Sequence, residues 1–209
     1  EKESPTPIDL KVSNIFHFAA WVPGQPNTIS YSTVEPRLGS PKFRANNDLF
    51  TLSFSSSGWA SKPETIIDTN SGGTYGWWGT NFAWSPDGNN LAYTRPDEVG
   101  LIDLEKGDFL PILKITPYQT HQDWAWIPGI TWGSDGNTLF VTTHAPSESL
   151  ISAEESPFFD MAAISMTNAT NIKMVSQTGM FSFPTSSPIL GSLSENDYQI
   201  ALLQAIVPD

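Results

Sequence analysis

An aromatic residue, a polar turn and an alternating apolar strand recur in this order along the chain. Two copies align without a gap: Trp84–Thr94, which reads WSPDGNNLAYT, and Trp132–Thr142, which reads WGSDGNTLFVT. A weaker copy begins at Leu193, and another, one residue longer, begins at Trp21. The four anchor residues lie 63, 48 and 61 residues apart. This spacing is typical of β-propeller blades with loop insertions, because a blade takes about 40–50 residues in four strands.

Each copy predicts a β-hairpin. The Asp-Gly pairs at 87–88 and 135–136 supply residues that tolerate the positive φ of a tight turn, so the anchor tryptophans end one strand and an antiparallel strand follows. No window of 11 or more residues shows a helical apolar period, so we expect only short turns, for example within 147–155. Third strands are expected at 48–53, 99–104 and 159–165, and fourth strands at 65–68, 110–115 and 171–175.

These strands predict an all-β fold, a β-propeller of four-stranded antiparallel blades, in a single segment that spans residues 1–209. An outer strand at 7–13 resembles the fourth strand at 111–116, and the chain stops within the fourth copy. About three and a half blades are therefore present, fewer than the usual four to eight, which predicts part of a larger ring of about six to eight blades. Its open end could pair with another chain. The predicted divisions are the end of a preceding blade (1–15), three blades (16–68, 69–116 and 117–176) and a half blade (177–209).

The repeat resembles that of the TolB-like, PD40-type β-propeller family, which reads Trp-Ser-Pro-Asp-Gly before a Leu/Ala/Tyr strand. Residues 84–93 match this pattern closely, and residues 132–141 match with Gly133 and Ser134 in place of Ser-Pro. The first and last copies match only the hydrophobic positions of this pattern. The resemblance implies the fold and no particular ligand. It also implies an exported module, in the periplasm or at a bacterial surface, that binds proteins or peptides.

Composition narrows the partners and the chemistry. The formal net charge of −12 disfavours nucleic acid and anionic membrane surfaces, which both need clustered positive charge. The chain has no cysteine, which excludes thiolate zinc sites, iron–sulfur clusters and cysteine nucleophiles. The longest nearly apolar stretch, residues 200–207, is far shorter than the roughly 20 residues of a membrane span.

Candidate binding residues lie in the loops that lead into the innermost strand of each blade, because these loops surround one mouth of the channel. Aromatic rings there can stack on peptide side chains or sugar faces. Packing between blades is the alternative use of the same rings, and the sequence leaves both open. The candidates are Trp77, Trp78, His121, Asp123, Trp124, Trp126, Phe181 and Phe183.

Signals for catalysis and for metal binding are weak. His17, His121 and His144 lack the spacing of metal ligands, and Asp87 and Asp135 fit turn residues better than calcium ligands. We therefore predict no metal and no cofactor. The innermost strands, expected at 18–21, 81–84, 130–132 and 189–193, carry no Asp or Glu, and no Gly-x-Ser-x-Gly motif occurs.

The functional prediction is a non-catalytic binding or scaffold module that recognises a protein or peptide, with a glycan as a further option. The alternative is the propeller portion of a larger hydrolase, such as a prolyl-oligopeptidase-like peptidase. A third possibility is a purely structural use, with self-association through the open propeller edge. Two insertions have opposite charge, basic at 35–47 and acidic at 145–160. They could attract a dipolar partner, or they could simply be solvated loops.

Overall fold

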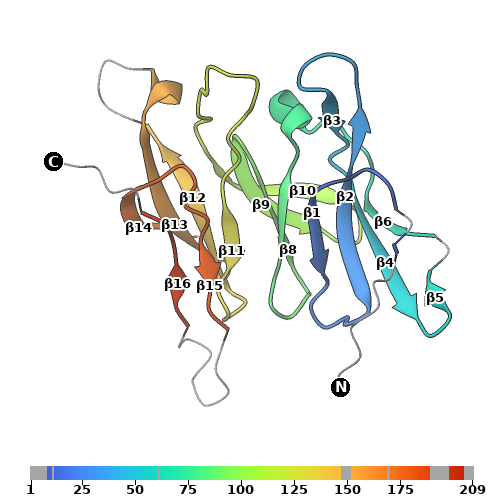
Figure 1. Cartoon of the computed structure of the whole chain (residues 1–209). Coiled ribbons are helices and arrows are strands. Elements are labelled where there is room, and N and C mark those ends of the chain that lie inside the picture. Colours follow the sequence, from blue (N-terminus) through green and yellow to red (C-terminus); the bar gives the residue numbers. More distant parts are fainter. Residues whose placement is uncertain are drawn as a thin grey trace, which may run out of the picture.

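The computed structural model describes residues 9–10, 12–60, 62–146, 152–168, 170–188 and 198–204. Within these residues, three large antiparallel sheets follow one another along the chain and a two-stranded sheet comes last (Figure 1). We call the large sheets blades I, II and III, and the last sheet the terminal hairpin. The sheets stand side by side without closing a ring (Figure 1). The prediction of an all-β propeller fold built from four-stranded antiparallel blades is confirmed.

Blade I carries more additions than the other blades. Its four main strands, which pair in chain order, are β1 (Ile15–Trp21), β2 (Thr28–Pro36), β4 (Leu49–Ser55) and β6 (Glu64–Ile67). Two short strands also belong to this sheet. β3 (Phe43–Ala45) pairs with β2, and β5 (Gly58–Trp59) pairs with β4. The insertion at 35–47 is therefore partly a strand. The outer strand expected at 7–13 is not observed at residues 9, 10, 12 and 13, and its other residues lie outside the described part of the chain.

Blades II and III each have four strands in chain order. Blade II consists of β7 (Asn81–Trp84), β8 (Leu91–Arg95), β9 (Glu98–Asp103) and β10 (Asp108–Lys114). Blade III consists of β11 (Ile130–Trp132), β12 (Thr138–Ala145), β13 (Phe158–Ser165) and β14 (Asn171–Thr178). The innermost strands expected at 81–84 and 130–132 are thus β7 and β11. The described helical segments are two short 3-10 helices, η1 (Gly73–Trp78) and η2 (Ala153–Glu155).

The terminal hairpin pairs β15 (Thr185–Ser186) with β16 (Ile200–Ala201). The sequence placed the first strand of this unit at 189–193, which lies outside the described residues. The strand that pairs with Ile200 is instead β15, earlier in the chain. The connection inside this last unit is therefore much longer than the Asp-Gly turns of blades II and III.

The Asp-Gly turns form as the repeat predicts. The Asp135 carboxylate accepts hydrogen bonds from the backbone N–H groups of Asn137 (2.9 Å) and Thr138 (3.1 Å). The Asp87 carboxylate accepts from the Ser85 hydroxyl (2.5 Å) and from the Asn89 N–H (3.1 Å). These bonds, the Ser85 bond first among them, lower the pKa of Asp87. Both aspartates therefore serve as local turn residues.

The two turn glycines make a matched pair for mutation. Gly88 and Gly136 both have positive φ, +74° and +68°. A Cβ on Gly136 meets nothing within 4 Å, whereas a Cβ on Gly88 would stand 2.2 Å from the Pro23 carbonyl oxygen of blade I. Gly136→Ala is therefore expected to lower the free energy of unfolding by about 1–2 kcal/mol, the cost of a left-handed alanine. Gly88→Ala should lower it further, and equal losses in urea unfolding would refute this account of the turn.

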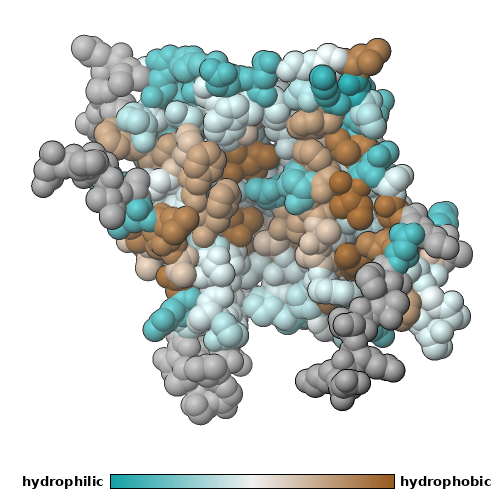
Figure 2. All heavy atoms as spheres, in the orientation of Figure 1, coloured by the Kyte–Doolittle hydropathy of each residue, from teal (hydrophilic) through white to brown (hydrophobic). Residues whose placement is uncertain are grey.

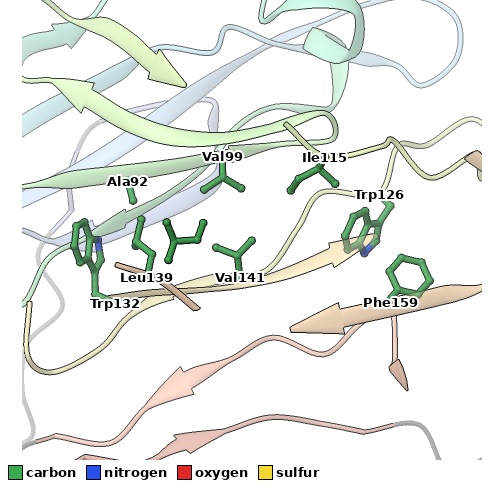
Figure 3. Close-up of a cluster of buried hydrophobic side chains, with 9 residues drawn as sticks. Ala92, Val99, Ile115, Trp126, Trp132, Leu139, Val141 and Phe159 are labelled. Atoms are coloured by element: carbon green, nitrogen blue, oxygen red, sulfur yellow. The ribbon is translucent and has the colours of Figure 1, made fainter. Parts of the chain in front are cut away.

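The hydrophobic core lies between consecutive blades. One cluster fills the space between blades I and II and includes Leu49, Phe82, Leu91 and Tyr93. A second cluster fills the space between blades II and III (Figure 3). Its members are Ala92, Val99, Ile115, Trp126, Trp132, Leu139, Val141, Phe159 and Ile164. Each blade is thus stabilised by burying apolar area against its neighbour.

The anchor tryptophans of the repeat also tie each blade to the one before it. The Trp84 indole N–H donates to the Ser30 hydroxyl on β2 of blade I (2.8 Å). The Trp132 indole N–H donates to the Ala83 carbonyl on β7 of blade II (2.8 Å). The repeated tryptophan therefore has a repeated contact across the blade boundary.

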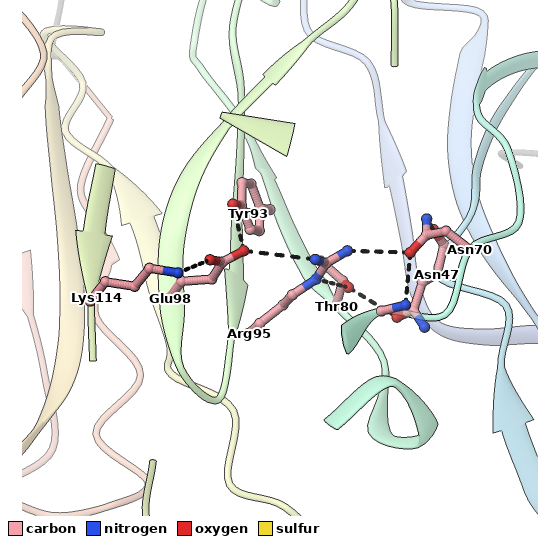
Figure 4. Close-up of polar contacts among 8 residues, drawn as sticks. Asn47, Asn70, Thr80, Tyr93, Arg95, Glu98 and Lys114 are labelled. Carbon is pink, nitrogen blue, oxygen red and sulfur yellow. Dashed lines mark hydrogen bonds and ion pairs between the residues drawn. The ribbon is translucent and has the colours of Figure 1, made fainter. Parts of the chain in front are cut away.

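A polar network centred on Arg95 reinforces the boundary between blades I and II (Figure 4). The guanidinium lies 3.3 Å from the Thr80 hydroxyl and 3.4 Å from the Asn70 side-chain oxygen. Its other end lies 3.7 Å from Glu98. The Thr80 hydroxyl in turn donates to the Asn47 side-chain oxygen (3.0 Å). This network holds the segment that runs through η1 into β7.

Candidate functional site

Four loop segments gather at the upper end of the molecule in Figure 1. They are the insertion between β2 and β3, the segment with η1, the connection from β10 to β11, and the segment with η2. Hydrophilic atoms dominate most of the upper edge, whereas hydrophobic atoms gather in a band below it (Figure 2). The candidate residues from the sequence lie in these loops or in the segment between β14 and β15, so this end is where we place the candidate site.

A stacked aromatic pair is the most distinctive feature of the site. The rings of Trp124 and Phe181 lie 6.4 Å apart between centroids at an interplanar angle of 22°. Trp124 comes from the loop before β11 and Phe181 from the segment before β15, so two successive units contribute one ring each. The two side chains are 36% and 57% exposed, respectively. Phe183 on the same segment is also exposed.

Hydrogen bonds next to the pair order the two segments that carry it. The Trp126 indole N–H donates to the Met180 carbonyl (2.6 Å), next to Phe181. The Thr120 hydroxyl donates to the Trp124 carbonyl (2.5 Å), which closes the loop on itself. Trp126 is 2% exposed and packs against Phe159 in the core. Its ring therefore presents no face to a ligand and acts as the support of the exposed pair.

The two tryptophans of η1 also differ in exposure, one packed against another ring and one exposed. Trp78 is half-buried and meets Phe43 edge-on, with centroids 5.9 Å apart. Trp77 is exposed, and the Arg37 guanidinium lies 5.3 Å from its ring centroid. The two uses that the sequence left open, packing and exposure, thus both occur. The exposed candidates, which we call the aromatic rim, are Trp77, Trp124, Phe181 and Phe183.

Polar contacts connect loops that are distant in sequence. The Ser40 hydroxyl donates to the Asp123 carboxylate (2.8 Å), which joins the basic insertion of blade I to the loop before β11. The His121 ring lies 3.3 Å from the Glu155 carboxylate in η2. The two oppositely charged insertions therefore both contact the loop at 120–126. Ser40 and Glu155 were not among the predicted site residues, although the opposite charges of their insertions were a signal for them.

The three histidines are separate from one another. The His17 ring lies 3.2 Å from the Thr80 carbonyl, and burial lowers the pKa of His17 although that hydrogen bond partly opposes the shift. Both ring nitrogens of the buried His144 face backbone carbonyls, those of Thr116 (3.0 Å) and Ser156 (2.7 Å). His144 thus lies between the loops that follow β10 and β12, and its neutral ring can donate to one of the two carbonyls. Among the described residues, no three His, Asp or Glu side chains are grouped to hold a metal ion.

No protein-family model matches the chain, and no curated protein matches its sequence. Among solved structures, TolB from Acinetobacter baumannii is similar at 15% identity and a TM-score of 0.48, over 78% of this chain and 34% of that one. The β-propeller domain of the Trilobed protease from Pyrococcus furiosus is similar at 12% identity and a TM-score of 0.42, over 92% of this chain and 51% of that one.

An acylaminoacyl peptidase from Pyrococcus horikoshii is similar at 14% identity and a TM-score of 0.47, over 81% of this chain and 26% of that one. The chain therefore spans between about a quarter and a half of the length of these proteins. At such identities the likeness concerns the fold alone. By its sheet order and its hairpin repeat, the chain has the fold of a β-propeller whose sheets do not close a ring within the described residues.

Proposed function

We propose that this chain is a non-catalytic binding module that recognises a protein or peptide through the aromatic rim. The observation that carries the proposal is the exposed stack of Trp124 on Phe181. Large aromatic rings that are exposed to solvent on the loops of a rigid fold are typical anchors of binding surfaces. A glycan, which also stacks on such rings, is the alternative ligand.

The rim is held in place before any ligand arrives. The Trp126 bond joins the two segments that carry Trp124 and Phe181, and the Thr120 bond closes the loop of Trp124, so a ligand does not have to order them. Asp123 and His121 offer polar groups beside Trp124, which suits a partner that has both apolar and polar groups. The described first strands β1, β7, β11 and β15 carry no Asp or Glu, which supports a binding role over glycosidase chemistry at these strands.

The wider setting is part of the same proposal. The resemblance of the repeat to TolB-like propellers supports a place outside the cytoplasm, in the periplasm or at a cell surface, within a ring of about six to eight blades. In the described part of the chain, no helix has the length and apolar character needed to cross a membrane. Fractionation of cells that express the native gene product tests the compartment.

Selection from a phage-displayed random peptide library against the whole chain tests the binding role. We expect enriched peptides whose affinity falls at least about tenfold in the double variant Trp124→Ala/Phe181→Ala, because large aromatic residues are frequent hot spots of binding surfaces. Ile172→Ala is the matched control, since Ile172 is also exposed but lies on the outer strand β14. Failure to enrich any peptide, or equal binding by the double variant, contradicts the proposal. Rim-dependent signals on a glycan array alone would replace the peptide with a glycan.

A further inference from the structure

The two ends of the aromatic rim differ in how their rings are used. At the Trp77 end, the Arg37 guanidinium lies 5.3 Å from the centroid of the Trp77 ring and pairs with the Glu35 carboxylate at 3.1 Å. An aromatic face and a carboxylate both attract a cation, so the two groups stabilise this arginine together. Arg44 lies opposite Glu35 where β3 pairs with β2, and Lys42 comes two residues before Arg44. The Trp77 end therefore already has positive charge from the chain itself.

The Trp124 end has the same two kinds of group without the cation. The stacked rings of Trp124 and Phe181 are exposed, and Asp123 precedes Trp124 in the chain. The Asp123 carboxylate accepts from a neutral group, the Ser40 hydroxyl (2.8 Å), and forms no ion pair with the described residues. Within that part of the chain, no arginine or lysine lies over either ring. This end therefore lacks the positive charge that the Trp77 end has.

Further carboxylates border the Trp124 end. Glu154 and Glu155 of η2 are both exposed. The backbone N–H of Gln119 donates to the Glu154 carbonyl (2.6 Å), which joins η2 to the loop that carries Trp124. Glu155 lies 3.3 Å from the His121 ring of that loop, whereas Glu154 has no ion pair among the residues that the structure describes. One carboxylate on the loop and two on η2 thus make the surroundings of Trp124 negative.

We propose that the Trp124 end of the rim binds an arginine side chain of the partner peptide, with the guanidinium stacked on the Trp124–Phe181 pair and balanced by the neighbouring carboxylates. This inference rests on the peptide-binding role proposed above and specifies its ligand. A guanidinium is favoured over the lysine ammonium because it stacks flat on aromatic faces and is more weakly hydrated. The formal net charge of −12 adds a long-range attraction for a basic partner.

Retention of capped peptide libraries by the immobilised whole chain tests the preference. Each library has arginine, citrulline, leucine or glutamate at one fixed central position and random residues elsewhere. Citrulline keeps the planar shape of arginine but lacks its charge. At about 0.01 M salt, the chain is expected to retain about fivefold more of the arginine library than of the citrulline library. This ratio should shrink at about 0.15 M salt, because the screening length falls from about 30 Å to about 8 Å.

Variants that remove charge locate the effect. Asp123→Asn/Glu154→Gln keeps the size of both side chains and removes two negative charges, so its preference for arginine over citrulline should fall to about twofold or less. Glu105→Gln is the matched control, since it removes an exposed carboxylate from the turn between β9 and β10, and it should keep the full preference. An undiminished preference in the double variant overturns the proposal. Circular dichroism of each variant verifies that it is folded.

Failure of this inference is distinguishable from failure of the proposed binding role. Retention that is lost in Trp124→Ala/Phe181→Ala but is equal for arginine and citrulline, or greatest for glutamate, would overturn the arginine preference and leave the binding role intact. Retention of none of the libraries above that of a blank support would contradict both proposals.

Discussion

Replacing Trp132 by alanine is expected to lower the free energy of unfolding by about 3–5 kcal/mol, the usual cost of removing a buried tryptophan. Trp132 is 4% exposed and packs in the cluster between blades II and III. Its removal opens a cavity at the blade boundary and leaves the Ala83 carbonyl without its donor. Because small domains are stable by only about 5–15 kcal/mol, this loss is a large fraction of the total. Urea unfolding followed by circular dichroism measures it.

Two further variants separate the contributions of Trp132. Trp132→Phe keeps most of the apolar volume and loses the hydrogen bond, so it should cost clearly less than the alanine variant and stay measurable if the alanine variant does not fold. Trp77→Ala removes an exposed tryptophan and should change stability by about 1 kcal/mol or less. If Trp132→Ala unfolds at the same urea concentration as Trp77→Ala, the blade boundary does not depend on the anchor tryptophan.

Glu98→Gln is expected to lower the free energy of unfolding by about 2 kcal/mol at neutral pH, because hydrogen bonds to a charged group contribute about 1.5–3 kcal/mol. Glu98 is buried and accepts hydrogen bonds from the Tyr93 hydroxyl (2.9 Å) and the Lys114 ammonium (2.8 Å). Arg95 lies 3.7 Å away (Figure 4). Glutamine keeps the shape of the side chain but not the charge that balances Arg95 and Lys114.

The same carboxylate predicts a pH dependence. Burial by itself raises the pKa of Glu98, but the hydrogen bonds from Lys114 and Tyr93 outweigh burial and hold it below 4.5. A pKa that is lower in the folded than in the unfolded chain stabilises the fold above pH 4.5, and this contribution is lost as the pH falls through the folded value. The wild-type chain should therefore lose stability below pH 4.5, and Glu98→Gln should lose less there.

A control distinguishes this group from the many other carboxylates. Glu105 is exposed in the turn between β9 and β10, so Glu105→Gln should leave both the stability and its pH dependence unchanged. Equal pH slopes for wild type and Glu98→Gln would show that Glu98 is not linked to unfolding.

The hairpins of the fold follow from the sequence because their causes are local. An Asp-Gly pair between two alternating apolar runs determines the turn, and the turn determines the register, so the strands at 81–84 and 130–132 were predicted to the residue. Where this turn chemistry is absent, as in the last unit, the prediction failed to find β15. The long connection after Ser186 offers no local signal for the strand that precedes it.

The candidate site depends on contacts that no local pattern contains. Trp124 and Trp126 are two residues apart in one loop, yet one is exposed and the other is buried. Packing against Phe159 and Met180 decides which ring lies inside, and these residues belong to a later strand and a later loop. The bond from Ser40 to Asp123 likewise joins residues that are 83 positions apart. The sequence by itself determined the repeat, the turns and the blades, since those depend on neighbouring residues, and only the tertiary structure decided which aromatic rings remain available for binding.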